Sequence, residues 1–165
     1  MRNIYLCGFM GCGKSHIGRM LADRLGMSLT DLDSYIEKAE NMSIPDIFRD
    51  KGEPFFRSLE AKYIGEMPEN SIVATGGGAI INPFVAETAR NAGTVIFLDA
   101  DFDTCYGRIK GDTHRPLVVN NTKEQLKELF DKRRAIYLEN SDFSVKADGR
   151  DADITESIIE KLEQK

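Results

Sequence analysis

The sequence has neither a long apolar run nor an excess of basic residues. A membrane-spanning helix needs about 18 or more consecutive apolar residues, and no segment of this chain approaches that length. The apolar run at residues 4–7 stops at a glycine and is too short for the core of a signal peptide. The chain has 22 Lys and Arg against 27 Asp and Glu, a formal net charge of −5. This charge speaks against nucleic acid and membrane surfaces as partners, because both attract basic proteins.

The three cysteines, Cys7, Cys12 and Cys105, do not form the pattern of a disulfide framework or a zinc site. Their number is odd, and a chain of 165 residues buries enough surface to fold without covalent staples. Cys7 and Cys12 also lack the second pair of Cys or His ligands that a zinc site requires. We therefore expect reduced thiols in a cytoplasmic protein, with Cys7 buried in a strand.

Apolar runs of strand length alternate along the chain with segments of helical periodicity. The strand-like runs are 4–7, 28–32, 72–75, 94–98 and 143–146. The helix-like segments are 14–25, parts of 34–67, 83–92, 101–110, 122–137 and the residues from 153 onward. Strands that alternate with helices favour a single α/β domain over residues 1–165, with a parallel sheet covered on both faces.

Polar residues and glycine mark where several of these helices begin and end. Gly26 is a natural stop for the first helix. The predicted helix starts are Ser43 followed by Pro45 and Asp46, Thr122 with Gln125, and Asp153 with Glu156.

Residues 8–15, Gly-Phe-Met-Gly-Cys-Gly-Lys-Ser, match the phosphate-binding pattern G-x-x-x-x-G-K-[ST] between a predicted strand and a predicted helix. Glycines let backbone N–H groups curl around phosphate oxygens, and the helix N-terminus adds partial positive charge. Lys14 would reach the β- and γ-phosphates, and the Ser15 hydroxyl would hold Mg²⁺. A dinucleotide fold is the competing interpretation, but it needs a third glycine where the chain has His16. Nucleoside triphosphate binding is therefore the firmest inference, with His16 expected at the surface.

Two groups of acids follow predicted strands. Asp31 and Asp33 end the second strand, at the edge where open α/β sheets bind ligands. Alternation along a strand would put both on one side, one nearer a metal and one nearer a substrate, while helix capping by one of them is the alternative. Asp99 ends an apolar strand like the metal-binding acid of other phosphate-loop proteins, but we favour a loop or N-cap acid there.

Arginines and a run of glycines offer further candidates. Arg57 has Glu53 four residues before it and Glu60 three residues after it, which predicts either a solvated ion pair or a guanidinium fixed for an anion. Arg134 lies on the aromatic side of its helix, either at the core edge or paired with Arg57 as a carboxylate clamp. Arg115 lies in a polar stretch and is either a surface residue or a mobile lid residue. The glycines at 76–78 predict a flexible turn or a close approach of a small ligand.

Together these motifs resemble the shikimate kinase family over nearly the whole chain. The phosphate loop alone is generic, and the combination is specific. The matching segments are 8–15, Asp31-Leu32-Asp33, Phe55-Phe56-Arg57 with Glu60, Thr75-Gly76-Gly77-Gly78, Arg115-Pro116-Leu117, and Arg133-Arg134-x-x-Tyr137. The resemblance implies a nucleoside-monophosphate-kinase-like fold with a five-stranded parallel sheet of order 2-3-1-4-5. It also implies transfer of the ATP γ-phosphate to the 3-hydroxyl of shikimate, in aromatic amino acid biosynthesis.

The resemblance also implies a set of residue roles. The acceptor-binding segment would be about 34–60 and the lid about 110–121, by analogy with the family. Catalysis would rest on Asp33, Lys14 and Arg115. Nucleotide contacts would come from Gly11, Cys12, Gly13, Lys14, Ser15, His16, Arg108, Arg115 and Arg150. Shikimate contacts would come from Asp33, Arg57, Gly77, Gly78 and Arg134, with Glu60 orienting Arg57 and with Phe48 and Phe56 as an apolar wall. Mg²⁺ would meet Ser15 directly and Asp31 through water.

Two rivals stay open at this point. The nearer one is a kinase for another small acceptor, such as gluconate or a nucleoside monophosphate. The more distant one is a nucleotide-binding switch without catalysis, which would present switch loops and a partner surface. We expect a monomer with shikimate and Mg-ATP as its partners.

Overall fold

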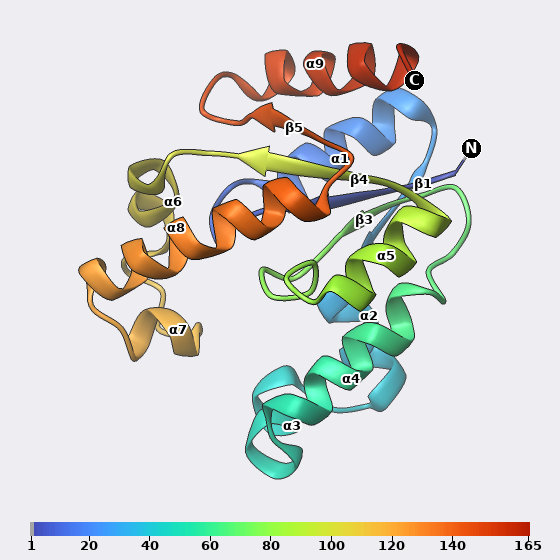
Figure 1. Ribbon diagram of the computed structural model, residues 1–165. Helices are drawn as coiled ribbons and strands as arrows, with labels where there is room; N and C mark the ends of the chain where they lie inside the picture. Colours follow the sequence, from blue (N-terminus) through green and yellow to red (C-terminus); the bar gives the residue numbers. More distant parts are fainter. Residues whose placement is uncertain (1) are drawn as a thin grey trace.

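The computed structural model describes residues 2–165 and shows a sheet of parallel strands between two layers of helices (Figure 1). These residues form one five-stranded sheet of order β2-β3-β1-β4-β5, which confirms the expected fold class and strand order. The strands are β1 (Asn3–Cys7), β2 (Ser28–Asp31), β3 (Ser71–Ala74), β4 (Gly93–Asp99) and β5 (Phe143–Lys146).

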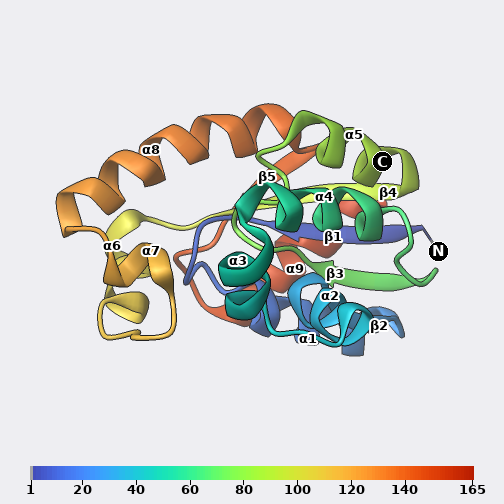
Figure 2. The same ribbon diagram turned by 90° about the horizontal axis from the view of Figure 1, so that it is seen from below.

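Helices cover both faces of the sheet (Figures 1 and 2). One face carries α1 (Lys14–Leu25) and α9 (Asp151–Glu163), and the other carries α5 (Pro83–Ala92) and α8 (Lys123–Asn140). Between β2 and β3 the chain forms α2 (Leu32–Glu40), α3 (Ile44–Lys51) and α4 (Glu53–Ile64). Beyond the carboxyl end of β4 it forms α6 (Phe102–Ile109) and α7 (Pro116–Val119).

The hydrophobic core follows the three inner strands. Leu6 in β1 lies opposite Ala74 in β3 and Ile96 in β4, and all three are buried. Each inner strand is apolar on both sides because helices pack on both faces of the sheet. The carboxyl ends of β1, β2 and β3 therefore meet at one edge, which positions the loops that follow them.

Most predicted helix boundaries are confirmed. Gly26 adopts φ 63° as the C-cap of α1, a left-handed conformation that favours glycine. Ser43 caps α3 by accepting a hydrogen bond from the Asp46 N–H at 3.2 Å. The Thr122 and Gln125 capping box at the start of α8 is complete, with both of its reciprocal bonds formed.

The predicted start of the last helix is wrong. The helix α9 begins at Asp151, with Arg150 as its N-cap residue, and Asp153 lies inside its first turn. Asp153 accepts hydrogen bonds from the Arg150 side chain at 2.8 and 3.1 Å instead of capping the helix. Two acids in the first turn suit the positive end of the helix dipole, and the N-cap lies three residues earlier than the pattern indicated.

Two further expectations concern the chain as a whole. The three cysteines are free and Cys7 is buried in β1, as predicted, and Cys12 and Cys105 are buried as well. Among the described residues, no helix is both long enough and apolar enough to cross a membrane.

Candidate active site

The loop between β1 and α1 leads into a helix N-terminus without a side-chain cap, and several of its residues line a cavity. Gly8, Gly11 and Gly13 have φ values of 151°, 79° and 101°, which side chains with a Cβ rarely adopt. Gly13 is the N-cap of α1, and no side chain of the described residues caps that helix end. The Lys14 ammonium donates to the carbonyl oxygens of Gly8 and Phe9 at 2.8 and 3.2 Å, which holds it across the loop. The open N–H groups and this ammonium form an anion cradle.

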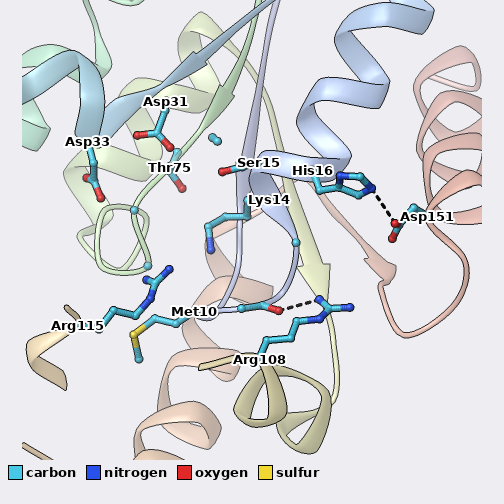
Figure 3. Close-up of a pocket in the computed structure, with 15 residues that line it drawn as sticks. Met10, Lys14, Ser15, His16, Asp31, Asp33, Thr75, Arg108, Arg115 and Asp151 are labelled. Atoms are coloured by element: carbon cyan, nitrogen blue, oxygen red, sulfur yellow. Dashed lines mark hydrogen bonds and ion pairs between the residues drawn. The ribbon is translucent and has the colours of Figure 1, made fainter. Parts of the chain in front are cut away.

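The cradle opens into a cavity of about 510 Å³ (Figure 3). Its walls are Met10, Gly11, Gly13, Lys14, Ser15, His16, Asp31, Asp33, Ala74, Thr75, Gly76, Gly77, Arg108, Arg115 and Asp151. Figure 3 shows the carboxylates of Asp31 and Asp33 on one side, with Lys14 and Arg115 pointing into the space between them and Arg108. The volume suits small ligands, and the polar groups of its wall converge from several elements.

Asp31 and Asp33 line this cavity together, but not in the way the strand pattern indicated. Asp31 ends β2 and caps α2, accepting a hydrogen bond from the Ser34 N–H at 2.9 Å. Asp33 belongs to the first turn of α2, so helical rotation and not strand alternation brings it to the cavity. The prediction that the two share one side of a strand is therefore wrong, although capping by one of them is confirmed.

Asp33 is held in an unusual environment for a carboxylate. Its Oδ1 atom is buried and has no hydrogen-bond partner among the described residues. Burial raises its pKa to about 6, and the neighbouring charge of Asp31 also raises it, against the lowering effect of Lys14 and Arg57. A buried oxygen without a partner is costly, so this atom is suited to a hydroxyl donor from a ligand.

Two of the glycines after β3 make room for functional side chains. A Cβ built on Gly76 would lie 2.9 Å from Asp33 Oδ1, and one built on Gly78 would lie 2.7 Å from the guanidinium carbon of Arg57. Both distances are shorter than real Cβ contacts, so any larger residue would displace these groups. The glycines therefore serve close approach, and not only a flexible turn.

Gly77, between them, meets a residue that the sequence analysis did not select. A Cβ on Gly77 would lie 3.3 Å from Arg133 Nη1, and the Tyr137 hydroxyl donates to the Gly77 carbonyl. The positive charge of Arg133 also lowers the pKa of Glu60. The three successive glycines thus bring Asp33, Arg133 and Arg57 to one place.

The structure corrects the expectation for Arg134, whose guanidinium is directed elsewhere. It donates two parallel hydrogen bonds to Asp99, at 2.9 and 2.8 Å, and Lys146 lies 3.0 Å from the same carboxylate. These residues line a separate cavity of about 440 Å³ with Phe130. Arg134 therefore does not pair with Arg57. Asp99 is the last residue of β4 and a buried ion-pair partner, and the N-cap of α6 is Asp101, so the prediction of Asp99 as a loop or N-cap acid is wrong.

Arg57 is oriented by two glutamates of its own helix, α4. Its Nη1 donates to Glu60 Oε1 at 2.6 Å, while Nε and Nη2 donate to Glu53 at 3.4 and 3.3 Å. Of the five N–H groups of the guanidinium, this leaves one on Nη1 and one on Nη2 without a partner in the part of the chain that the structure describes. These two suit a bidentate oxyanion.

Phe48 and Phe56 lie beside this arginine. Their ring centroids are 5.0 Å apart, and the Arg57 guanidinium lies 5.3 Å from the Phe56 ring centroid. The aromatic pair therefore places apolar rings next to the Arg57 guanidinium.

The opposite side of the cavity is built from α1, α6 and α9. Arg108 donates to the Gly11 carbonyl at 2.8 Å, and His16 Nε2 lies 2.9 Å from Asp151 (Figure 3). All four residues line the cavity. Arg150 precedes Asp151 but is largely exposed, pairs within its own helix and does not line the cavity.

The expected lid carries Arg115 at the start of α7. Arg115 is half-exposed, lines the cavity and forms an ion pair with Asp112 at 2.9 Å. Leu117 and Val119 in the same short helix are exposed. The segment therefore has little contact with the core, as a mobile element requires.

Cys12 and two residues that the sequence analysis missed complete the site. The Cys12 side chain is buried inside the loop, 3.7 Å from the Lys14 ammonium, so only its backbone can face a phosphate. Met10 and Thr75 line the cavity, but no chemical signal in the sequence marked either one.

Comparison with known proteins identifies the family. The family model for shikimate kinase matches residues 10–163. A shikimate kinase of Persephonella marina is 46% identical over 152 residues, which cover 91% of this chain and 92% of that protein. A shikimate kinase of Sulfurihydrogenibium sp. is 39% identical over 168 residues and 100% of both chains. The structure of the Acinetobacter baumannii shikimate kinase in complex with shikimate matches at a TM-score of 0.91 and 33% identity, covering 99% of this chain and 94% of that one. The chain therefore belongs to the shikimate kinase family.

Proposed function

We propose that this protein transfers the γ-phosphate of ATP to the 3-hydroxyl of shikimate, giving ADP and shikimate 3-phosphate. The observation that carries the proposal is the run Gly76–Gly78, against which Asp33, Arg133 and Arg57 pack in succession. Shikimate carries a carboxylate on one end of its ring and hydroxyl groups on the other. A pair of arginines beside a buried carboxylate matches that distribution of charge.

The nucleotide binds at the phosphate cradle in this proposal. The N–H groups of Gly11 and Gly13 face its phosphates, and the Lys14 ammonium leaves the carbonyls of Gly8 and Phe9 to bind phosphate oxygens. The Cys12 N–H donates to the Phe9 carbonyl at 3.1 Å, so a nucleotide contact of Cys12 stays a prediction. His16 and Arg108 line the same side of the cavity and contact the nucleotide. Arg150 stays a prediction, since it lies next to that wall but outside it.

The donor set also fits Mg²⁺. The Ser15 hydroxyl and the Asp31 carboxylate are hard oxygen donors on one cavity wall. The described residues hold no cluster of three His, Cys, Asp or Glu side chains that would bind a metal alone. This suits an ion that takes most of its ligands from phosphates and water, with Asp31 acting through water. Bound there, Mg²⁺ supplies neutralisation of phosphate charge.

The acceptor is held by its carboxylate. Arg57 offers its two remaining N–H groups, and Arg133 takes the place that the sequence analysis had given to Arg134. Glu60 keeps the Arg57 guanidinium in one orientation, and Phe48 with Phe56 faces the apolar part of the ring. The fixed orientation places the acceptor hydroxyl in line with the γ-phosphate.

Asp33 and Arg115 act on the reacting groups. Asp33 is mostly ionised at neutral pH, since its pKa is about 6, and it accepts or steers the proton of the 3-hydroxyl. Arg115 leaves Asp112 when the lid closes and stabilises the charge on the transferred phosphoryl group. Only positioning and electrostatics are needed for such a transfer.

The proposal includes a monomer in the cytoplasm. One chain supplies the cradle, the acceptor groups and the lid, and its three free thiols are what a reducing compartment preserves.

An ADP-release assay with single acceptors tests the proposal. Shikimate, gluconate and a nucleoside monophosphate are compared at equal concentration, with a reaction that lacks acceptor as the blank. We expect ADP release with shikimate only, and Asp33→Ala should abolish it while Mg-ATP binding persists. Turnover with gluconate or a nucleotide instead of shikimate would contradict the assignment, and nucleotide binding without any acceptor-dependent turnover would favour the switch.

A further inference from the structure

Glu60 is a buried acid with an incomplete set of partners. Its side chain is 2% exposed, and its Oε1 accepts one hydrogen bond, from Arg57 Nη1 at 2.6 Å. Its Oε2 atom is buried and has no hydrogen-bond partner within residues 2–165. A buried carboxylate oxygen in that position is costly, and a proton on it would remove most of the cost.

The charges that face Glu60 come from three helices. Arg57 belongs to its own helix α4, Asp33 comes from α2, and Arg133 comes from α8. Burial and the charge of Asp33 raise the pKa of Glu60, and the two arginines lower it, with about 7 as the result. The ionised form of Glu60 therefore depends on the two arginines.

An acceptor carboxylate would bind to those same two arginines. In the free site, Arg57 faces the buried carboxylates of Asp33 and Glu60 and the exposed carboxylate of Glu53, and Arg133 faces Glu60. A bound acceptor carboxylate adds one more anion beside these two arginines, in a place where Glu60 is shielded from water. Charges of one sign interact more strongly in such a place than in bulk water, so the site gains by losing one negative charge.

We propose that Glu60 takes up one proton from solvent when the carboxylate of the acceptor binds between Arg57 and Arg133. The proton forms an O–H bond at the Oε2 atom and no other bond is broken. Oε1 keeps its hydrogen bond from Arg57, so Glu60 still positions the guanidinium. Protonation neutralises Glu60, and the ligand carboxylate supplies the negative charge beside the arginines instead. Glu60 is thus a positioning residue that makes the site selective for an anionic acceptor. The inference rests on the proposed function.

Proton uptake by Glu60 determines the direction in which acceptor affinity changes with pH. A group whose pKa rises on binding adds affinity that is complete at low pH and lost as the pH increases through its pKa in the complex. Acceptor affinity should therefore fall as the pH rises from about 6 to about 8.5, by roughly 3- to 15-fold if the pKa of Glu60 rises by about 0.5 to 1.5 on binding.

Calorimetric titration of the full-length enzyme with shikimate measures the proton directly. At pH 7 the observed enthalpy is plotted against the ionisation enthalpy of several buffers, and the slope counts protons taken up. We expect about 0.25 to 0.5 proton per acceptor, because Glu60 is close to half ionised in the free site at its pKa of about 7 and mostly protonated in the complex.

Matched variants assign the proton to Glu60. Glu60→Gln keeps an oxygen for Arg57 but cannot titrate, so its proton count should fall near zero and its affinity should vary little with pH. Glu53→Gln removes the other carboxylate on Arg57, which is 62% exposed, and should keep the wild-type count.

The outcomes separate the two proposals. Binding by the wild-type enzyme without proton uptake and with pH-independent affinity would overturn the role of Glu60 alone. Uptake that persists in Glu60→Gln would overturn it as well. An absence of shikimate binding would overturn the proposed function, and this role with it. The wild-type measurements decide the matter even if the Gln variant folds poorly.

Discussion

The position of each charged side chain in this site depends on the space that its neighbours leave. Gly76 and Gly78 let a carboxylate and a guanidinium approach to distances that a Cβ would not permit, and Gly77 leaves tight room for a second guanidinium. The chemistry of the acceptor side therefore rests as much on the missing side chains as on the charged ones.

Adjacent arginines on α8 should give opposite phenotypes. Arg133→Ala should raise the KM for shikimate roughly 10- to 100-fold, because a charge-assisted hydrogen bond contributes about 1.5–3 kcal/mol. Arg134→Ala should leave KM close to the wild-type value and lower the unfolding free energy, since buried Asp99 loses its two hydrogen bonds. Steady-state kinetics and urea denaturation of both variants provide the measurement. A large KM effect for Arg134→Ala, with none for Arg133→Ala, would show that Arg134 binds the acceptor carboxylate, as the sequence had predicted.

That choice shows what sequence spacing cannot decide. Arg133 lies three residues after Phe130 and four before Tyr137, while Arg134 lies four after and three before. Both spacings put a side chain on the same helix face as its neighbours. The arginine that reaches the site is set by the rotation of α8 relative to β4, which depends on packing across the sheet. The phosphate-loop residues, by contrast, could be predicted because their pattern fixes both conformation and position.

At the scale of elements, strands and helix caps were largely predictable because local chemistry determines them. The boundary between β2 and α2 was not, because the apolar pattern runs through Leu32 while the chain already turns helical there. The short helix α7 was expected only as a polar loop, since four residues are too few for a periodic signal.

The segment that carries α7 should act only in phosphoryl transfer. Arg115→Ala should lower kcat by about 10²-fold, because a donor aimed at transition-state charge is lost, while shikimate affinity changes little. Lys110→Ala, in the same segment but outside the cavity wall, is the control of equal charge. Single-turnover kinetics and equilibrium binding distinguish the two effects. An equal loss in both variants would refute a specific role for Arg115.

The capping box of α8 should stabilise the folded protein but have little effect on catalysis. Thr122→Ala should lower the unfolding free energy by about 1 kcal/mol, since the Gln125 N–H at the helix start loses its acceptor. Its kcat/KM should stay within about twofold of wild type, because α8 is anchored near the site by Arg134 and by Tyr137. Denaturation and kinetics on the same preparation provide the measurement. A kinetic loss that exceeds the stability loss would contradict this separation.

The whole molecule carries a net charge of −5, yet its cavity gathers Lys14, Arg108 and Arg115. Anionic ligands are therefore attracted locally by an acidic protein. Global stability also depends on pH, because burial raises the pKa of Glu60.

The unfolding free energy should vary with pH because the buried Glu60 has a raised pKa. Glu60 has a pKa of about 7 in the folded protein against an ordinary value of 4.5, so its contribution is complete below about pH 4.5 and is lost as the pH rises through about 7. Relative to wild type, Glu60→Gln should therefore gain up to about 3 kcal/mol over this interval, at about 1.4 kcal/mol for each unit of pKa. Urea denaturation at several pH values measures the difference, with Glu53→Gln as the exposed control. A difference that stays constant with pH would show that Glu60 ionises normally.

Carboxylate recognition by Arg57 and Arg133 is tested most directly by comparing shikimate with its methyl ester as acceptors for the wild-type enzyme. The ester keeps the ring and the 3-hydroxyl but lacks the anionic carboxylate. We predict shikimate-dependent ADP release with a kcat/KM at least about 100-fold higher than that for the ester, because bidentate, charge-assisted bonds to Arg57 and Arg133 are lost. Equal kcat/KM values for acid and ester, or ADP release that does not depend on shikimate, would contradict recognition of the shikimate carboxylate by these arginines.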